Sequence, residues 1–255
     1  MEKINRTSQA IAEKAIDIRD NPDYIVSPRG MEVREQIAGQ YKVPMMAYID
    51  NADRNVNYDF MFAEAAWICS GSNQLRDLTD TMKSYPNYSD DGIFLSGAYG
   101  VKVVDQMRYV VDTLEKDNDS RQAFINIWRE NPRDSKDVPC TTSMQFLIRD
   151  NELNMISNMR SHDIVLGSTY DVFSFSAVAN SIRLLLKERG VDVNLGDLTV
   201  NAGSLHLYER HYDDIDRWVN SDNVNAEIGK RVLSVMQAET YYDFIDALKE
   251  ESTKQ

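Results

Sequence analysis

Apolar residues recur every three or four positions in several segments of the chain, a spacing that places them on one side of a helix. Residues 1–20 follow this pattern and stop at Asn21-Pro22, where the proline disfavours helical backbone in the preceding residue. Residues 101–116 follow it up to a polar turn. Residues 58–71 are apolar on nearly every side and close on a glycine, which is typical of a buried helix. We therefore predict a surface helix over 1–20, a buried helix over 58–71 and a further helix over 101–116.

The second half of the chain begins with short apolar runs, at 122–128, 143–149 and 153–159. Asp150-Asn151 separates the last two runs and is typical of a hairpin turn, so we expect neighbouring strands there. A long helix over 171–190 and a strand over 198–210 are predicted next. Together these elements indicate one α/β (α+β) domain over residues 1–220, with residues 221–255 as its acidic, helical C-terminal extension.

The charge and the cysteine content restrict the function. The 255 residues carry a net charge of -13, which opposes direct binding of nucleic acid, since that requires a basic face. An anionic ligand must therefore be small and bound by a local arginine cluster. Two cysteines, a polar N-terminus and no apolar run of membrane-spanning length predict a cytoplasmic protein without disulfides, secretory signal or membrane helix.

Cys140 is the first candidate for chemistry, because it lies directly after Pro139 and before two threonines. A cysteine can act as a nucleophile when its thiolate is stabilised. Free cysteine is also among the most buried residue types, so Cys140 could be a structural residue of a strand. Its position alone leaves both interpretations open.

Other polar side chains interrupt apolar segments nearby. Glu64 lies in the predicted buried helix, Asp171 opens a predicted helix, and residues 160–163 (Arg-Ser-His-Asp) close a strand. His206 and Tyr208 lie two positions apart on a strand and hence on the same face. Structural alternatives remain open: Glu64 as a salt-bridged core acid, Asp171 as a helix N-cap, and the arginine and aspartate of 160–163 as a surface pair.

Four blocks in order carry a family resemblance: FAEAAWICSG, DNDSRQ, VPCTTSMQFLIRD with NMRSHDIVLG, and NAGSLHLYERH. The chain resembles the thymidylate synthase superfamily, and most closely its phage-type deoxycytidylate hydroxymethylases. The resemblance extends over about residues 27–218. It implies a mixed β-sheet flanked by helices and a homodimer formed through the sheet.

The resemblance implies a reaction. Cys140 matches the thiolate that adds to C6 of a pyrimidine nucleotide, so that C5 attacks the one-carbon unit of 5,10-methylenetetrahydrofolate, the cosubstrate. A depressed pKa of the Cys140 thiol, supplied by arginines and bound nucleotide, is expected. Glu64 matches the glutamate that relays protons and also binds the cofactor, and Tyr99 matches a tyrosine near the cysteine. Asp163 and Gly167 match folate-binding positions, and no metal is implied.

Phosphate and sugar contacts are also implied. Arg29, Arg160 and Ser161 match phosphate-binding positions, and Arg121 matches an arginine that reaches the phosphate from the partner subunit. Gln122 stands where the family usually has a second arginine, which weakens the expected contact from the partner. His206 and Tyr208 match the pair that binds the 3′-hydroxyl; a zinc site formed with His211 is a weaker alternative.

Two departures from the synthases favour cytosine as the base. Thr141 follows the cysteine, as in the hydroxymethylases, and Asp171 stands where the synthases have an asparagine. Uracil offers an N3 donor beside an O4 acceptor, which an amide can pair with. Cytosine reverses this pattern, so it fits a carboxyl group that shares a proton with N3 and accepts from N4. Asp171 is therefore expected to select and activate dCMP.

The sequence ALKEESTKQ after residue 246 has no apolar lid, and we expect water to reach the methylene intermediate and give a 5-hydroxymethyl product. A dCMP methyltransferase, a dUMP hydroxymethylase or a thymidylate synthase-like enzyme remain alternatives. A nucleotide-binding homologue without catalysis is disfavoured because the catalytic set is retained.

Overall fold

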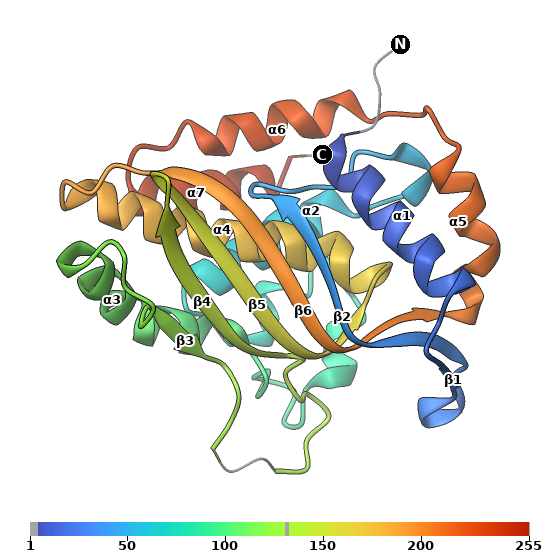
Figure 1. The fold of residues 1–255 in the computed structure, drawn as a ribbon. Coiled ribbons are helices and arrows are strands. Elements are labelled where there is room, and N and C mark those ends of the chain that lie inside the picture. The colour runs from blue at the N-terminus through green and yellow to red at the C-terminus, as the bar shows by residue number, and fades with distance from the viewer. Residues whose placement is uncertain (1–4, 131–132, 255) are drawn as a thin grey trace.

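The computed structural model describes residues 5–130 and 133–254, and its centre is a six-stranded mixed sheet (Figure 1). The strand order is β1-β2-β6-β5-β4-β3. Among the described strands, β5 and β6 pair in parallel and the other neighbours pair antiparallel. The strands are β1 (Tyr24–Val26), β2 (Val33–Pro44), β3 (Phe124–Asn126), β4 (Thr141–Arg149), β5 (Glu152–Asp163) and β6 (Asn194–Tyr208). The predicted α/β class with a mixed sheet is confirmed.

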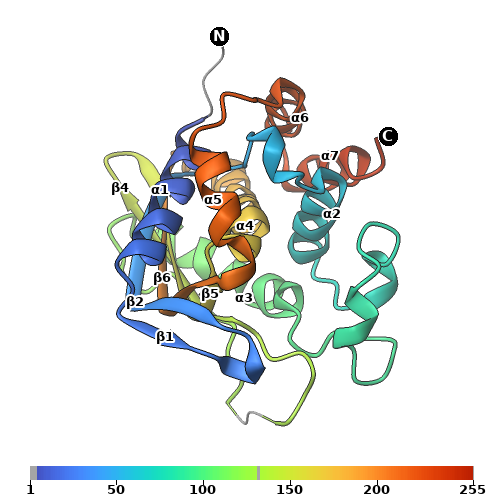
Figure 2. The same ribbon diagram turned by 90° about the vertical axis from the view of Figure 1, so that its right-hand side faces the viewer.

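Helices cover one face of this sheet (Figure 2). The long helix α4 packs against β5 and β6, and α2 packs on α4. In Figure 1 no helix crosses in front of β4, β5 and β6, so their other face is uncovered within the described chain. The helices are α1 (Arg6–Asp20), α2 (Tyr58–Cys69), α3 (Tyr99–Lys116), α4 (Leu166–Glu188), α5 (Tyr212–Val219), α6 (Ala226–Met236) and α7 (Tyr241–Glu251).

All four helices predicted within residues 1–220 and the predicted hairpin are present, although α4 begins at Leu166, five residues before the expected start. The first helix is confirmed from residue 6 onward; its first four residues lie outside the described chain. Asn57 begins α2 by accepting a hydrogen bond from the Phe60 amide at 3.0 Å. Asp150 and Asn151 have φ of 51° and 62° and connect β4 to β5, as a two-residue turn of primed type requires.

The strands of residues 24–44 and helix α5 were not predicted. In β2 the alternation of buried and exposed residues is broken at Ala38, whose φ of 55° lies in the left-handed region. Pairing with β6 passes from Ile37 directly to Gly39, so Ala38 is an irregularity in the ladder. A side chain at Gly39 would meet Leu205 of β6 at 2.6 Å, which explains the glycine.

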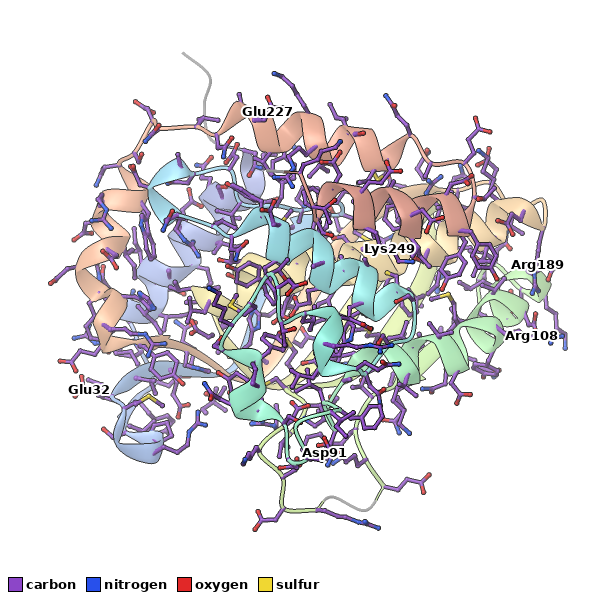
Figure 3. The ribbon with its side chains drawn as sticks, turned by 180° about the vertical axis from the view of Figure 1, so that it is seen from behind. Glu32, Asp91, Arg108, Arg189, Glu227 and Lys249 are labelled. Carbon is purple, nitrogen blue, oxygen red and sulfur yellow. The ribbon has the colours of Figure 1, made fainter. Side chains whose placement is uncertain are left out.

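The C-terminal helices pack onto the back of the domain, which Figure 3 shows from behind with Glu227 of α6 and Lys249 of α7 labelled. Phe244 and Leu248 of α7 are fully buried in the common core. Arg231 of α6 binds Asp59 at the start of α2 at 3.0 Å, and it also binds the acid that ends α7. None of the helices in the described part of the chain is both long and apolar enough to cross a membrane.

Candidate active site

Cys140 lies directly before β4 and is half-buried, with its sulfur beside a guanidinium. Arg160 Nη2 lies 3.7 Å from Cys140 Sγ. The same side chain donates to the carbonyls of Val138 and Pro139, each at 3.0 Å, and not to an acid. The segment before the cysteine therefore fixes the guanidinium next to the thiol, and the interpretation of Arg160 and Asp163 as a surface pair is wrong.

The pKa of the Cys140 thiol differs from the expectation. Burial raises it above its ordinary value, and the charges of Arg160 and Arg29 lower it but do not offset the burial. Asp171 and Asp137 raise it further. The expected depressed pKa is therefore absent in the chain on its own, and the thiol is protonated at neutral pH.

A pocket of about 420 Å³ lies next to this pair, and Arg160 reaches from the thiol into it. Arg29, in a short helical turn before β2, supplies a second guanidinium and has a left-handed φ of 54°. His206 and Tyr208 both face the pocket, which confirms that they share one face of β6. The lining residues are Val26, Pro28, Arg29, Val33, Glu35, Arg160, Ser161, Ser204, His206 and Tyr208. Two guanidiniums and several polar groups in one hollow fit a phosphorylated sugar.

Glu64 projects from the middle of α2 between two hydroxyl groups. Tyr85 donates to Oε1 at 2.7 Å and Ser174 of α4 donates to Oε2 at 3.2 Å. Its partners are thus hydroxyls and not a cation, so the interpretation as a salt-bridged core acid is wrong. Burial, followed by the charge of Asp171, raises the pKa of Glu64 to about 7. A carboxyl group with this pKa can accept and release a proton near neutrality.

Asp171 lies inside α4, five residues after its start at Leu166, so the interpretation as an N-cap is wrong. Asp163 instead caps this helix, because its Oδ1 accepts from the amides of Val165 at 2.8 Å and of Leu166 at 3.1 Å. Placed one and a half turns into the helix, Asp171 is free for another role. Its side chain is 20% exposed.

The charge of Asp171 acts on three other candidates. It raises the pKa of Glu64 and of Cys140, and, after burial, it is the main cause of the raised pKa of Tyr99. The Tyr99 hydroxyl also accepts from the Thr141 amide at 3.3 Å, directly after the cysteine. Glu64 of α2, Tyr99 at the start of α3 and Cys140 directly before β4 therefore all lie close enough to Asp171 to respond to its charge.

Asp163 and Gly167, the residues expected to bind folate, lie at the end of β5 and in the first turn of α4. Asp163 uses Oδ1 to cap α4, and no bond to its Oδ2 is found within the described chain, which leaves one oxygen for a pterin donor. Gly167 lies one turn further, where a side chain would crowd Asp171. These features fit a folate ring beside α4. Among residues 5–130 and 133–254, no cluster of His, Cys, Asp or Glu is arranged to hold a metal.

Arg121 is not brought to the pocket in the single chain. It is exposed in the turn before β3, and its carbonyl accepts from Gln145 on β4 at 3.0 Å. It does not line the pocket that Arg29 and Arg160 share.

Three residues of the site had no predicted role: His162, Tyr41 and Tyr85. His162 is 2% exposed and lies 3.3 Å from Asp171, and Tyr41 binds its other ring nitrogen. Burial along β5 alternates regularly up to Met159 and then changes phase, so alternation alone would assign His162 to the uncovered face. The signal that could have found it was its place beside Arg160 and Asp163 in one short segment.

Known proteins are similar to most of the length of this chain. A sequence model described as thymidylate synthase matches residues 29–252. The deoxyuridylate hydroxymethyltransferase of Bacillus phage SP01 is 29% identical over 212 residues, covering 74% of this chain and 54% of that protein. The deoxycytidylate 5-hydroxymethyltransferase of Enterobacteria phage T2 is 27% identical over 220 residues, covering 78% of this chain and 85% of that protein. The chain thus spans about half the length of the phage deoxyuridylate enzymes that it matches.

The fold has a solved counterpart in thermostable thymidylate synthase A from Bacillus subtilis. The two superpose with a TM-score of 0.73 over 95% of each chain, at 20% identity. At this identity the likeness concerns the fold, and the predicted thymidylate synthase-like fold is confirmed.

Proposed function

Because the chain belongs to the thymidylate synthase family, we propose that it transfers a one-carbon unit from 5,10-methylenetetrahydrofolate to C5 of dCMP and releases 5-hydroxymethyl-dCMP. The single observation that supports the reaction best is the contact between Cys140 and Arg160 beside the pocket that Arg29 and Arg160 share. It puts a nucleophile at a fixed distance from the group that would anchor the nucleotide.

In this mechanism Arg29, Arg160 and Ser161 bind the phosphate, and His206 with Tyr208 binds the sugar hydroxyl. Cys140 Sγ then bonds to C6, and the electron pair of the C5–C6 bond makes C5 a nucleophile. 5,10-Methylenetetrahydrofolate would supply the carbon. Loss of the C5 proton and departure of tetrahydrofolate then leave an exocyclic methylene group at C5. Water adds to this group, and release of the Cys140 thiolate from C6 restores the C5–C6 double bond.

Glu64 and Tyr99 would manage protons in these steps. The pKa of Glu64, raised to about 7, suits a group that takes and returns a proton through water near C4 and C5. Tyr99 keeps its proton, because burial raises its pKa, and it can donate beside the cysteine.

The choice of dCMP rests on Asp171. A carboxyl group accepts from the cytosine amino group and can share a proton with N3, whereas two acceptors face each other when uracil O4 is opposite. Each unpaired buried polar atom costs about 1–3 kcal/mol, so the wrong base would be disfavoured about tenfold or more. A dUMP hydroxymethylase is the runner-up, because three phage deoxyuridylate hydroxymethyltransferases are 27–29% identical to this chain.

A homodimer of cytoplasmic subunits completes the proposal. On the sheet face that no helix covers, two side-chain hydrogen bonds link neighbouring strands. Gln40 of β2 donates to Asn201 of β6 at 2.6 Å, and Asn201 donates to Asn158 of β5 at 3.1 Å. Pairing of two such faces would bring Arg121 of one subunit toward the other subunit's phosphate pocket.

The test is mass spectrometry of products formed from 5,10-methylenetetrahydrofolate and equimolar dCMP and dUMP. Hydroxymethylated cytosine nucleotide is expected. A methylated cytosine nucleotide would contradict the water step alone, and a modified uracil nucleotide would contradict the role of Asp171. Asp171→Asn is expected to lower the dCMP to dUMP preference by about tenfold or more.

A non-catalytic nucleotide binder is the alternative of a different class. Release of tritium from C5-labelled nucleotide separates the two, because a binder releases none. The release must also disappear in Cys140→Ser if the cysteine is the nucleophile.

A further inference from the structure

His162 is a buried imidazole whose two nitrogens face two different groups. Nε2 lies 2.8 Å from the Tyr41 hydroxyl, and the two rings stack with their centroids 5.7 Å apart. Nδ1 lies 3.3 Å from Asp171 Oδ2 and has no hydrogen-bond partner of good geometry within the described chain. The imidazole side chain itself is fully shielded from solvent.

The neighbours of the ring determine where its proton lies. Burial and the charge of Asp171 raise the pKa of Tyr41 well above its ordinary value, so the phenol keeps its proton and can donate it to Nε2. Nδ1 then carries the ring hydrogen, 3.3 Å from Oδ2 of Asp171, although the N–H bond is not aligned with that oxygen in this structure. The opposite tautomer would direct a nitrogen lone pair at carboxylate lone pairs in a buried place, which is unfavourable.

Gly167 keeps the space beside this contact open. It precedes Asp171 by one turn of α4, and a Cβ at this position would lie 3.2 Å from His162 Nδ1 and 3.3 Å from Asp171 Oδ2. Both distances are shorter than most side-chain contacts. The absence of a side chain therefore lets the imidazole and the carboxyl group approach each other.

We propose that His162 is a positioning residue for Asp171: held by Tyr41, it donates from Nδ1 to Oδ2, fixes the plane of the carboxyl group and leaves Oδ1 for the pyrimidine edge. This inference rests on the proposed function for its effect on substrates. Three side chains would then contribute to the selection of the base: Tyr41 of β2, His162 of β5 and Asp171 of α4.

The hydrogen-bond arrangement can be tested without substrate. The chain has three histidines, so long-range ¹⁵N–¹H spectra of labelled imidazoles are simple, and His162→Asn identifies the signals of His162. A proton on Nδ1 is expected, and Tyr41→Phe should increase the share of the Nε2 tautomer. A wild-type ring protonated only at Nε2 would overturn the proposal.

The effect on catalysis is tested with a set of substitutions at one position. The amide nitrogen of asparagine can replace Nδ1, whereas that of glutamine replaces Nε2 and leucine replaces neither. His162→Leu and His162→Gln are expected to lower kcat/KM for dCMP by about 10–100-fold and to reduce the preference over dUMP, while His162→Asn retains most of both.

Equal losses in the asparagine and leucine variants, or an unchanged dCMP to dUMP ratio in the glutamine and leucine variants, would overturn the positioning role. Thermal unfolding of each variant identifies loss of packing. If the leucine variant does not fold, the comparison of asparagine with glutamine decides. If the wild-type protein does not convert dCMP, the proposed function fails, and the spectra still decide whether His162 donates to Asp171.

Discussion

Glu64→Gln removes an ionisable group from the site and keeps a side chain of nearly the same shape. In the wild-type protein, burial and the charge of Asp171 raise the pKa of Glu64 from 4.5 to about 7. The carboxyl group of the unfolded chain keeps its ordinary pKa, so between these values the folded state binds more protons than the unfolded state. The contribution of Glu64 to stability is therefore greatest below pH 4.5 and is lost as the pH rises through about 7.

The size of this effect follows from the same two values. A rise from 4.5 to about 7 favours the protonated carboxyl group by about 3 kcal/mol in the folded state. The wild-type protein should lose up to that amount of unfolding free energy from Glu64 on going from acid to about pH 8, and the glutamine variant should lose none of it. Relative to wild type, Glu64→Gln is thus expected to be more stable at alkaline pH than in acid.

Urea unfolding at about pH 5 and about pH 8 measures the difference. Asp105→Asn, on the exposed side of α3, is a control with the same change of charge. Equal pH dependence in Glu64→Gln and wild type would refute the reasoning, because the carboxyl group would then not titrate near 7. Glu64→Gln should also lose turnover. In Tyr85→Phe, Glu64 loses a hydrogen bond that lowers its pKa, so the pH–rate profile should move to higher pH.

Three further predictions concern neighbouring residues. Cys140→Ser should abolish turnover and still bind dCMP, as equilibrium dialysis can measure, with a change in stability within about 1 kcal/mol because the residue is half-buried. Arg160→Gln should raise KM for dCMP by about tenfold or more, and it should slow alkylation of Cys140 by iodoacetamide at a given pH, since the arginine lowers the thiol pKa. Gly167→Ala should reduce kcat in steady-state assays, because its Cβ would press on His162 and Asp171 and move the carboxyl group.

Local chemistry made part of the fold predictable. The turn at Asp150-Asn151 needs two residues with positive φ, and aspartate and asparagine tolerate that backbone, so the sequence indicates the hairpin directly. His206 and Tyr208 share a face because a strand repeats every two residues. Each of these predictions depends on residues within a few positions of one another.

Long-range packing made the rest unpredictable. The start of α4 depends on Asp163, which caps the helix from the end of the preceding strand, and apolar spacing alone placed the start five residues too late. The partners of Glu64 come from two distant segments, at Tyr85 and Ser174. The thiol pKa of Cys140 depends on how deeply the folded chain buries it. Burial raises this pKa by more than the two arginines lower it, and only the arginines can be recognised in the sequence.

The position of Asp171 links base selection to the reactivity of the site. Its charge raises the pKa of both Cys140 and Glu64, so these two groups release their protons least readily while Asp171 is charged. A cytosine that shares a proton with the carboxyl group would reduce the charge and lower the pKa of the thiol, whereas uracil, with its own proton on N3, would not. In the proposed function, the correct base therefore favours formation of the nucleophile, and the burial that keeps the free thiol protonated contributes to the specificity.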